Sequence, residues 1–182
     1  MKKINLSIIS LLIISCTINK NKNMQKKEYT FLTSYNQFYL ISDKDNFIDT
    51  LMNIDEDTYT ARLGLQKNRI IIFSQSFSNI KGDIEVLETP NKIDYKKYDH
   101  IVEGGIEVYS GELQILSWPG SEVELSIELK PGKYRVRINS ANLSSVKETD
   151  LAHDTDNDFY HIEIWPNENM ELKVLKQSVL KL

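Results

Sequence analysis

The sequence is poor in several of the residues on which catalytic and metal sites depend. Its 182 residues include one cysteine, Cys16, and three histidines. A single cysteine excludes a disulfide within the chain, so burial of apolar side chains must stabilise the fold. The GxSxG, phosphate-loop and HExxH motifs are also absent from the sequence. We therefore expect no catalytic residue, no cofactor and no enzymatic activity.

The histidines do not form the pattern of a metal site. Such a site needs at least two of them to converge with a carboxylate. His161 and Glu163 are two residues apart in one expected strand, so they face the same side. A cupin-type jelly roll would need a second histidine two positions from the first, and neither His100 nor His153 meets this condition. We expect isolated histidines near the surface and no bound metal.

The sequence also lacks an apolar run long enough to span a bilayer, which needs about 20 residues. Residues 1–15 instead have the charged start and short apolar stretch of a secretory signal. The motif Ile13-Ile14-Ser15-Cys16 is similar to a bacterial lipobox, in which the cysteine is acylated and becomes the first mature residue. The alternative is an ordinary signal peptide that contains a cysteine. We expect a lipid anchor at Cys16, with the domain outside the cytoplasm in a bacterial cell envelope.

Positive charge is scarce in the remainder of the chain. Residues 16–28 form a polar, lysine-rich segment that we interpret as a tether, and residues 29–182 have the length of one domain. This domain has 16 basic and 25 acidic side chains, which gives a net charge of −9. Such a domain repels nucleic acid and attracts basic proteins. We expect a basic protein partner and no direct contact with nucleic acid.

Alternation of apolar and polar residues dominates the domain. It is clearest in residues 123–129 and 133–139, and Pro131-Gly132 between them predicts a tight hairpin. Residues 58–65 alternate in the same way, whereas residues 69–77 include a continuous apolar run that predicts a buried central strand.

Other segments complete the prediction of an all-β fold. Gly104-Gly105 is expected to separate two strands, and residues 47–54 are the one candidate for a short helix. About ten short strands with turn signals between them predict a single antiparallel β-sandwich, jelly-roll-like, with little helix.

An acidic loop, residues 153–158, precedes one of the expected strands. Asp154, Asp156 and Asp158 match the first positions of an EF-hand, but Phe159 and Trp165 stand where that loop needs glycine and glutamate. Two interpretations remain open. The loop is a solvated turn, or it presents carboxylates, together with Asp150, to the basic partner.

Two tryptophans, Trp118 and Trp165, each precede a proline. Each ring can cap the end of a strand against the core. Exposed rings could instead stack on a ligand such as a glycan. The second possibility gives an alternative function, a ligand- or glycan-binding surface lipoprotein.

Three segments resemble the competence protein J family, small all-β bacterial proteins that inhibit a nuclease of DNA uptake. They are residues 34–38 (SYNQF), residues 63–73 (LGLQKNRIIIF) and residues 129–134 (LKPGKY). The lipobox, the tether and the longer part after Asn142 depart from that family. The resemblance implies an inhibitor or immunity-type protein with a nuclease as its partner, and the negative charge of the domain is compatible with this role.

Overall fold

The computed structural model describes residues 25–42, 54–119 and 122–182. The predicted signal segment, Cys16 and most of the predicted tether lie outside these ranges, as does nearly all of the helix predicted at residues 47–54. Within the described ranges, no helix is long and apolar enough to cross a membrane.

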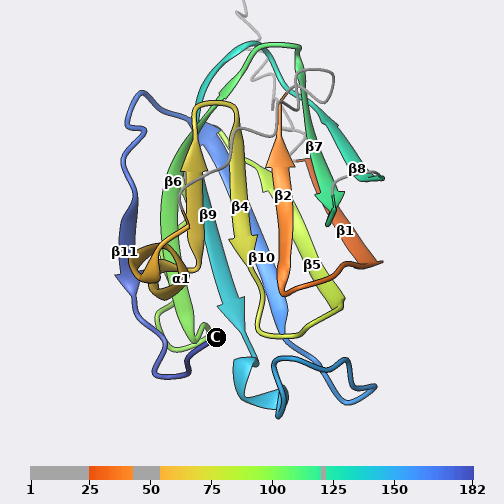
Figure 1. Ribbon diagram of the computed structural model, residues 1–182. Coiled ribbons are helices and arrows are strands. Elements are labelled where there is room, and N and C mark those ends of the chain that lie inside the picture. The colour runs from red at the N-terminus through yellow and green to blue at the C-terminus, as the bar shows by residue number, and fades with distance from the viewer. Residues whose placement is uncertain (1–24, 43–53, 120–121) are drawn as a thin grey trace, which may run out of the picture.

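The described chain forms two β-sheets, with one short α-helix and one 3-10 turn (Figure 1). The six-stranded sheet has the order β1 (Gln25–Leu32), β5 (Asn79–Val86), β10 (Phe159–Pro166), β9 (Gly132–Ala141), β6 (His100–Val108) and β11 (Lys173–Lys176). The five-stranded sheet has the order β3 (Leu63–Gln66), β4 (Arg69–Phe73), β2 (Gln37–Ile41), β7 (Glu112–Ser117) and β8 (Val123–Glu128). The all-β prediction is confirmed, and its finer jelly-roll-like form stays a prediction.

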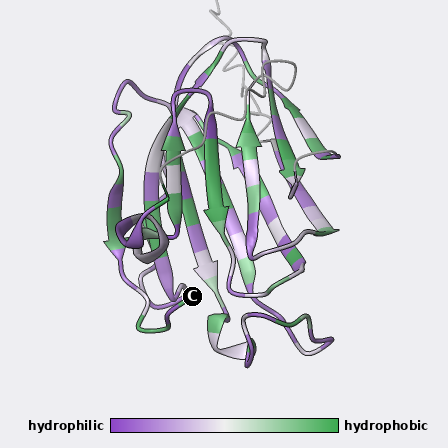
Figure 2. Cartoon of the chain, in the orientation of Figure 1, coloured by the Kyte–Doolittle hydropathy of each residue, from purple (hydrophilic) through white to green (hydrophobic). Residues whose placement is uncertain are grey.

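One apolar cluster joins the two sheets. Ile70 and Ile72 of β4 and Ile162 and Ile164 of β10 all belong to it, because alternate residues of each strand face the other sheet. Strand β4 is buried at every position, which confirms the predicted central strand. Apolar residues are concentrated in this strand and its neighbours (Figure 2).

The sequence predicted antiparallel pairing throughout, and this prediction is wrong for one pair of strands. Strand β10 pairs with β5 in parallel, from Tyr160 opposite Gly82 to Ile164 opposite Val86. Four strands separate β5 from β10 along the chain, so no short turn forces their directions to be opposite.

Two glycine-containing segments have roles other than those predicted. Pro131-Gly132 connects β8 of the five-stranded sheet to β9 of the six-stranded sheet. It is therefore part of a connection between the sheets and not a hairpin. Gly104 and Gly105 lie inside β6. A Cβ on Gly104 would lie 2.5 Å from Cδ2 of Leu65, so this glycine allows β3 to approach β6 closely.

The prediction of a strand at residues 58–65 is wrong for the first half of this range. Residues Glu56–Ala61 form helix α1, and β3 begins only at Leu63. Asp55 caps the helix by accepting a 2.9 Å hydrogen bond from the Thr58 N–H. Arg62 ends the helix in the left-handed conformation, with φ of 55°.

Strand β1 begins at Gln25, four residues before the predicted start of the domain. Lys27 donates a 2.8 Å hydrogen bond from Nζ to the carbonyl of Ser126 in β8 and so connects the two sheets. The apolar pattern starts only at Tyr29, which packs in the core. For this reason the sequence placed the boundary too late.

The inward face of β9 gives a direct test of this core. Val136 is fully buried between the sheets, whereas Val123 on the edge strand β8 is 37% exposed. We expect Val136→Asp to lower the free energy of unfolding by about 4 kcal/mol or more, because it buries an unpaired charge. Val123→Asp introduces the same group at the surface and should cost about 0.5 kcal/mol. Urea denaturation checks both values, and equal losses would contradict the burial assigned to Val136.

Candidate functional site

A row of charged side chains crosses the outer face of the six-stranded sheet. We call it the ionic row. Its members are Lys26, Asp83, His161, Glu163, Arg137, Glu103 and Arg135. Each member contacts the next, and cations alternate with anions along the row.

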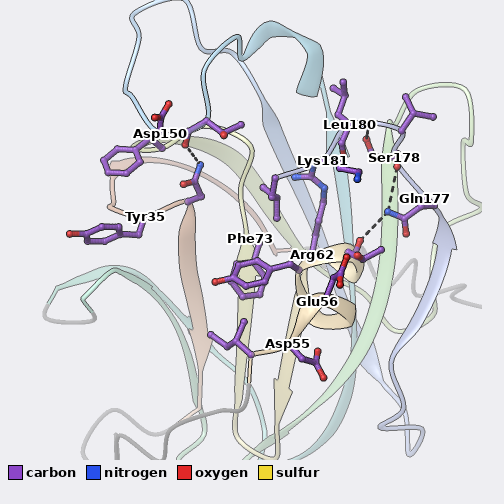
Figure 3. Close-up of a pocket in the computed structure, with 18 residues that line it drawn as sticks. Tyr35, Asp55, Glu56, Arg62, Phe73, Asp150, Gln177, Ser178, Leu180 and Lys181 are labelled. Atoms are coloured by element: carbon purple, nitrogen blue, oxygen red, sulfur yellow. Dashed lines mark hydrogen bonds between the residues drawn. The ribbon is translucent and has the colours of Figure 1, made fainter.

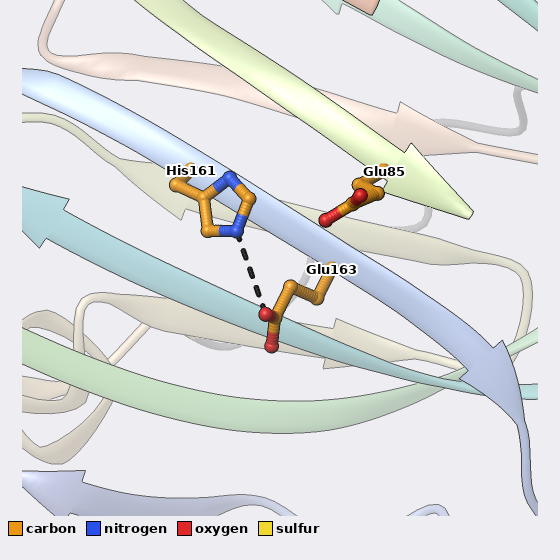
Figure 4. Close-up of side chains that lie close together, drawn as sticks. All are labelled: Glu85, His161 and Glu163. Carbon is orange, nitrogen blue, oxygen red and sulfur yellow. Dashed lines mark ion pairs between the residues drawn. The ribbon is translucent and has the colours of Figure 1, made fainter. Parts of the chain in front are cut away.

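The strand register brings these groups together. His161 lies opposite Asp83, and Glu163 lies opposite Glu85, in the parallel pairing of β10 with β5 (Figure 4). On the other side of β10, Glu163 lies opposite Arg137 of β9, and Arg137 Nη1 is 2.7 Å from Glu163 Oε2. The sequence showed that His161 and Glu163 share a face, but it did not show which strands are their neighbours.

The pKa values of His161 and Glu163 on β10 are both shifted in the direction that favours the charged form. Burial by itself would lower the pKa of His161, but hydrogen bonds to Glu163 and Asp83 and their negative charges raise it overall. Burial likewise would raise the pKa of Glu163, but hydrogen bonds from His161 and Asn91 and the charge of Arg137 lower it overall. Each group therefore favours the charged form of the other.

Glu85, His161 and Glu163 offer ligand atoms within 4.8 Å of one another, which is close enough for a metal ion. Their lone pairs already have other partners. Glu163 accepts hydrogen bonds from Arg137 at 2.7 Å and Asn91 at 2.9 Å, and Asn91 also donates to Glu85 at 3.2 Å. A metal ion would have to compete with the guanidinium of Arg137. This arrangement has the character of an ion-pair network and not of an open metal centre.

The acidic loop has two different halves. Asp156 and Asp158 are 2% and 1% exposed, so their carboxylates are not available to a partner at the surface. Asp158 Oδ2 accepts hydrogen bonds from the backbone N–H of Ser76 at 2.9 Å and from the hydroxyl of Tyr160 at 2.5 Å. The predicted partner-binding residues that remain at the surface are Asp150 and Asp154.

The two tryptophans do not form a stacking platform. Trp165 is 4% exposed, and Arg137 lies over its ring at 5.0 Å from the centroid. Trp118 is half-buried and packs against Tyr39, with ring centroids 5.7 Å apart. Neither ring lies in the groove described next.

A groove of about 1140 Å³ lies on the outer side of the five-stranded sheet (Figure 3). Its walls come from the turn before β2, helix α1, the loop before β10 and residues 177–182. Two exposed aromatic side chains, Tyr35 and Tyr59, line it, together with the carboxylates of Asp55, Glu56 and Asp150. We call these three carboxylates the acidic rim. The groove thus combines apolar contact area with three carboxylates, and the cationic residues Arg62 and Lys181 also line it.

Arg62 lies at the base of the groove and is 2% exposed. Its Nη2 donates to Gln75 Oε1 at 2.5 Å and to the carbonyl of Leu180 at 3.0 Å. Its Nη1 is buried and has no hydrogen-bond partner among the described residues. Burial lowers the pKa of Arg62, although the charges of Tyr160 and Asp158 oppose this.

His100 fixes the segment that closes one side of the groove. Its ring is fully buried. Nε2 lies 3.0 Å from the carbonyl of Ala61 and must carry the proton, so Nδ1 can accept the Ser178 N–H at 3.2 Å. The third histidine, His153, is partly exposed and lies 3.3 Å from Glu148.

Sequence reasoning missed most of this groove. It identified Asp150 but not Arg62, Tyr35, Tyr59 or the α1 carboxylates. One signal was available, since Asp55 followed by the acidic residues Glu56 and Asp57 is typical of a helix N-terminus and would have moved the expected helix toward its observed position. Nothing in the sequence indicated that residues 177–182 would return to α1.

The neutral state of His100 predicts a dependence of stability on pH. Burial, helped by Arg62 and opposed by the hydrogen bond to Ala61, lowers its pKa to about 4. The unfolded chain takes up this proton near pH 6.5, so the contribution of His100 is complete above about pH 6.5 and is lost as the pH falls to about 4. We expect a loss of about 3 kcal/mol in the free energy of unfolding over this window.

Urea denaturation at several pH values tests this with two matched variants. His100→Gln keeps a donor and an acceptor but cannot titrate, so it should lose less stability than the wild type on acidification. His153→Gln removes a partly exposed imidazole in the same way and is the matched control. His161 acts in the opposite direction, since a raised pKa gives stability at low pH that is lost as the pH rises through it. Identical pH profiles for the wild type and His100→Gln would refute the neutral ring.

Comparison with known proteins gives a structural likeness only. No family model and no curated protein sequence matches the chain. The structure is similar to that of ComJ from Bacillus subtilis, an inhibitor of the DNA-degrading activity of NucA, with a TM-score of 0.60 at 16% identity over 79% of this chain and 98% of ComJ. The protein of crocagin biosynthetic gene J is also similar, with a TM-score of 0.50 at 14% identity over 80% of this chain and 100% of that one. The chain therefore has a ComJ-like fold.

Proposed function

We propose that this chain is an acidic binding protein that inhibits a basic protein partner, a DNA-degrading nuclease. The groove carries this proposal, because exposed aromatic side chains and three carboxylates line it. Aromatic side chains supply much of the binding energy in protein interfaces, and charge complementarity supplies rate and selectivity. The ComJ-like fold supports the same role, since ComJ inhibits a nuclease.

The electrostatics of a nuclease explain why the inhibitor should be acidic. A nuclease cleft must attract phosphate, so it is positively charged. The acidic rim presents Asp55, Glu56 and Asp150 where such a cleft would otherwise hold phosphates. The net charge of −9 over residues 29–182 adds a longer-range attraction. Binding of this kind is fast and weakens as salt is added.

The polar clusters of the domain support binding over catalysis. Members of the ionic row pair with one another, and Asp158 is held by Ser76 and Tyr160 inside the fold. These groups stabilise the structure and are not free to act on a substrate. The carboxylates of the acidic rim, by contrast, belong to exposed residues.

We further propose that Cys16 carries a lipid anchor and that the domain lies at the membrane in a bacterial envelope. The signal-like residues 1–15 and the lipobox-like motif support this. A membrane-bound inhibitor would meet a nuclease that acts on DNA at the same surface.

A capture experiment tests the inhibitor role. Residues 17–182, immobilised through an added tag, are incubated with a membrane extract of the organism that encodes the chain. We expect the eluate to contain a basic protein that degrades DNA and that loses this activity when free domain is added. An eluate without nuclease activity, or with activity that the domain leaves unchanged, would contradict the proposal.

The groove is tested by removing the acidic rim. The variant Asp55→Asn, Glu56→Gln, Asp150→Asn keeps side-chain size and the Asp55 cap while removing three charges. We expect the association rate with the captured nuclease to fall about ten-fold and its salt dependence to become weaker. Stopped-flow or surface plasmon resonance measurements at several salt concentrations check both.

The matched control removes three charges elsewhere. Glu122→Gln, Glu124→Gln, Glu128→Gln changes the net charge equally but alters strand β8 and its preceding residue. A rate as low as that of the rim variant would show that net charge, and not the groove, controls binding.

The anchor has its own test. We expect Cys16→Ala to abolish lipid labelling and to release the chain from membranes or leave it unprocessed, because the acylated sulfur is lost. Metabolic labelling with a fatty-acid analogue and membrane fractionation measure this. Normal processing and membrane retention of Cys16→Ala would exclude the lipobox interpretation.

A further inference from the structure

Residues 178–182 form one wall of the groove, and their backbone is bound by its base in the manner of an extended peptide. The Ser178 N–H donates to Nδ1 of His100 at 3.2 Å. The Leu180 carbonyl accepts from Arg62 Nη2 at 3.0 Å. The Lys181 carbonyl accepts from Gln75 Nε2 at 3.1 Å. All three contacts use the backbone of the segment, so they would be available to a segment of different sequence.

One side chain of the segment is anchored by apolar contact. Leu182 packs against a second apolar cluster on the outer face of the five-stranded sheet, which includes Tyr39, Ile71 and Phe73. The side chain of Val179, in contrast, is 97% exposed, and Lys181 is also exposed. The groove therefore holds this segment through its backbone and one apolar residue.

The groove is equipped for more contacts than the segment makes. Nη1 of Arg62 is buried without a partner among the described residues, although a guanidinium donates five hydrogen bonds. Tyr35 and Tyr59, on other walls of the groove, remain 68% and 48% exposed. Figure 3 shows Arg62 between the wall with Tyr35 and Asp150 and the wall with Leu180 and Lys181.

We propose that the groove is a peptide-binding site for an extended segment of a partner protein, and that residues 178–182 occupy the Arg62 and Gln75 side of it in the absence of that partner. The segment that fits has backbone carbonyls for Arg62 and Gln75, one apolar side chain at the position of Leu182, and basic side chains toward the acidic rim. Binding requires residues 178–182 to leave. This inference concerns the kind of partner and does not depend on the partner being a nuclease.

The geometry also explains why the competition would be balanced. A tethered segment has an effective concentration in the millimolar range, so a few hydrogen bonds and one leucine suffice to hold it. A partner that adds contacts to Tyr35, Tyr59 and the acidic rim has more to gain from the same groove. The segment therefore prevents weak ligands from binding. A ligand that also contacts the acidic rim can displace it.

A peptide supplied in trans tests this proposal without any knowledge of the natural partner. The protein is a chain that stops after Gln177, and the probe is a fluorescent peptide with the sequence of residues 178–182. We expect the truncated chain to bind this peptide at least ten-fold more tightly than the complete chain does, because the complete chain already holds the segment. Fluorescence anisotropy measures affinity, and NMR shifts of the His100 ring and the Gln75 side-chain amide report the position.

Peptide variants serve as controls that leave the protein unchanged. A peptide with Leu182→Asp should bind at least ten-fold more weakly, since it places a charge against the apolar cluster. A peptide with Lys181→Glu should bind more weakly at low salt only, through repulsion by the acidic rim. In the truncated chain, Arg62→Met should weaken binding of the original peptide at least ten-fold.

Each outcome is decisive. Equal affinities for the truncated and complete chains, or binding that ignores Leu182→Asp, would place the peptide elsewhere and overturn the proposal. If the truncated chain is unstable alone, the peptide must raise its melting temperature, because a ligand that binds only the folded state stabilises it. A truncated chain that stays folded without binding peptide, or stays unfolded with it, would also overturn the proposal.

Discussion

The parallel pairing of β10 with β5 is the constraint on which most of the structure depends. At Tyr160 the two backbones lie so close to Tyr29 that a Cβ on Gly82 would be 2.2 Å from the Tyr160 carbonyl and 2.3 Å from the Tyr29 hydroxyl. The missing side chain lets Tyr29 donate a 2.8 Å hydrogen bond to that carbonyl. A shift of β10 by one residue would turn Tyr160 outward and His161 into the core. Both faces of the sheet are therefore fixed by one register.

The same strand connects the core to the groove. The hydroxyl of Tyr160 accepts the N–H of Gln75 at 2.6 Å and donates to Asp158, while the Gln75 side chain contacts Arg62 and the Lys181 carbonyl. A buried polar chain thus runs from the acidic loop to the segment in the groove. Asp158 contributes to the candidate site through this support and not through surface charge.

The sequence predicted strands where the pattern has period two, as in β8 and β9, or where an apolar run is continuous, as in β4. It failed where local pattern is ambiguous or where the reason is tertiary. The alternation of Tyr59, Ala61 and Leu63 is compatible with a helix followed by a strand. Gly104 resembles a turn residue, and only the approach of Leu65 shows why it lies inside a strand. The groove joins segments far apart in the chain, and no local pattern encodes their meeting.

The early start of β1 has a consequence for where the domain can act. Gln25 is already part of the six-stranded sheet. If Cys16 carries a lipid, only the residues between Cys16 and Gln25 would therefore serve as the tether. A fully extended chain of that length reaches about 30 Å, roughly the thickness of the hydrocarbon core of a bilayer. A tether of this length would keep an anchored domain close to the membrane. If Cys16 is acylated, the domain would stay within a thin layer over the lipid headgroups, and a partner would have to enter that layer.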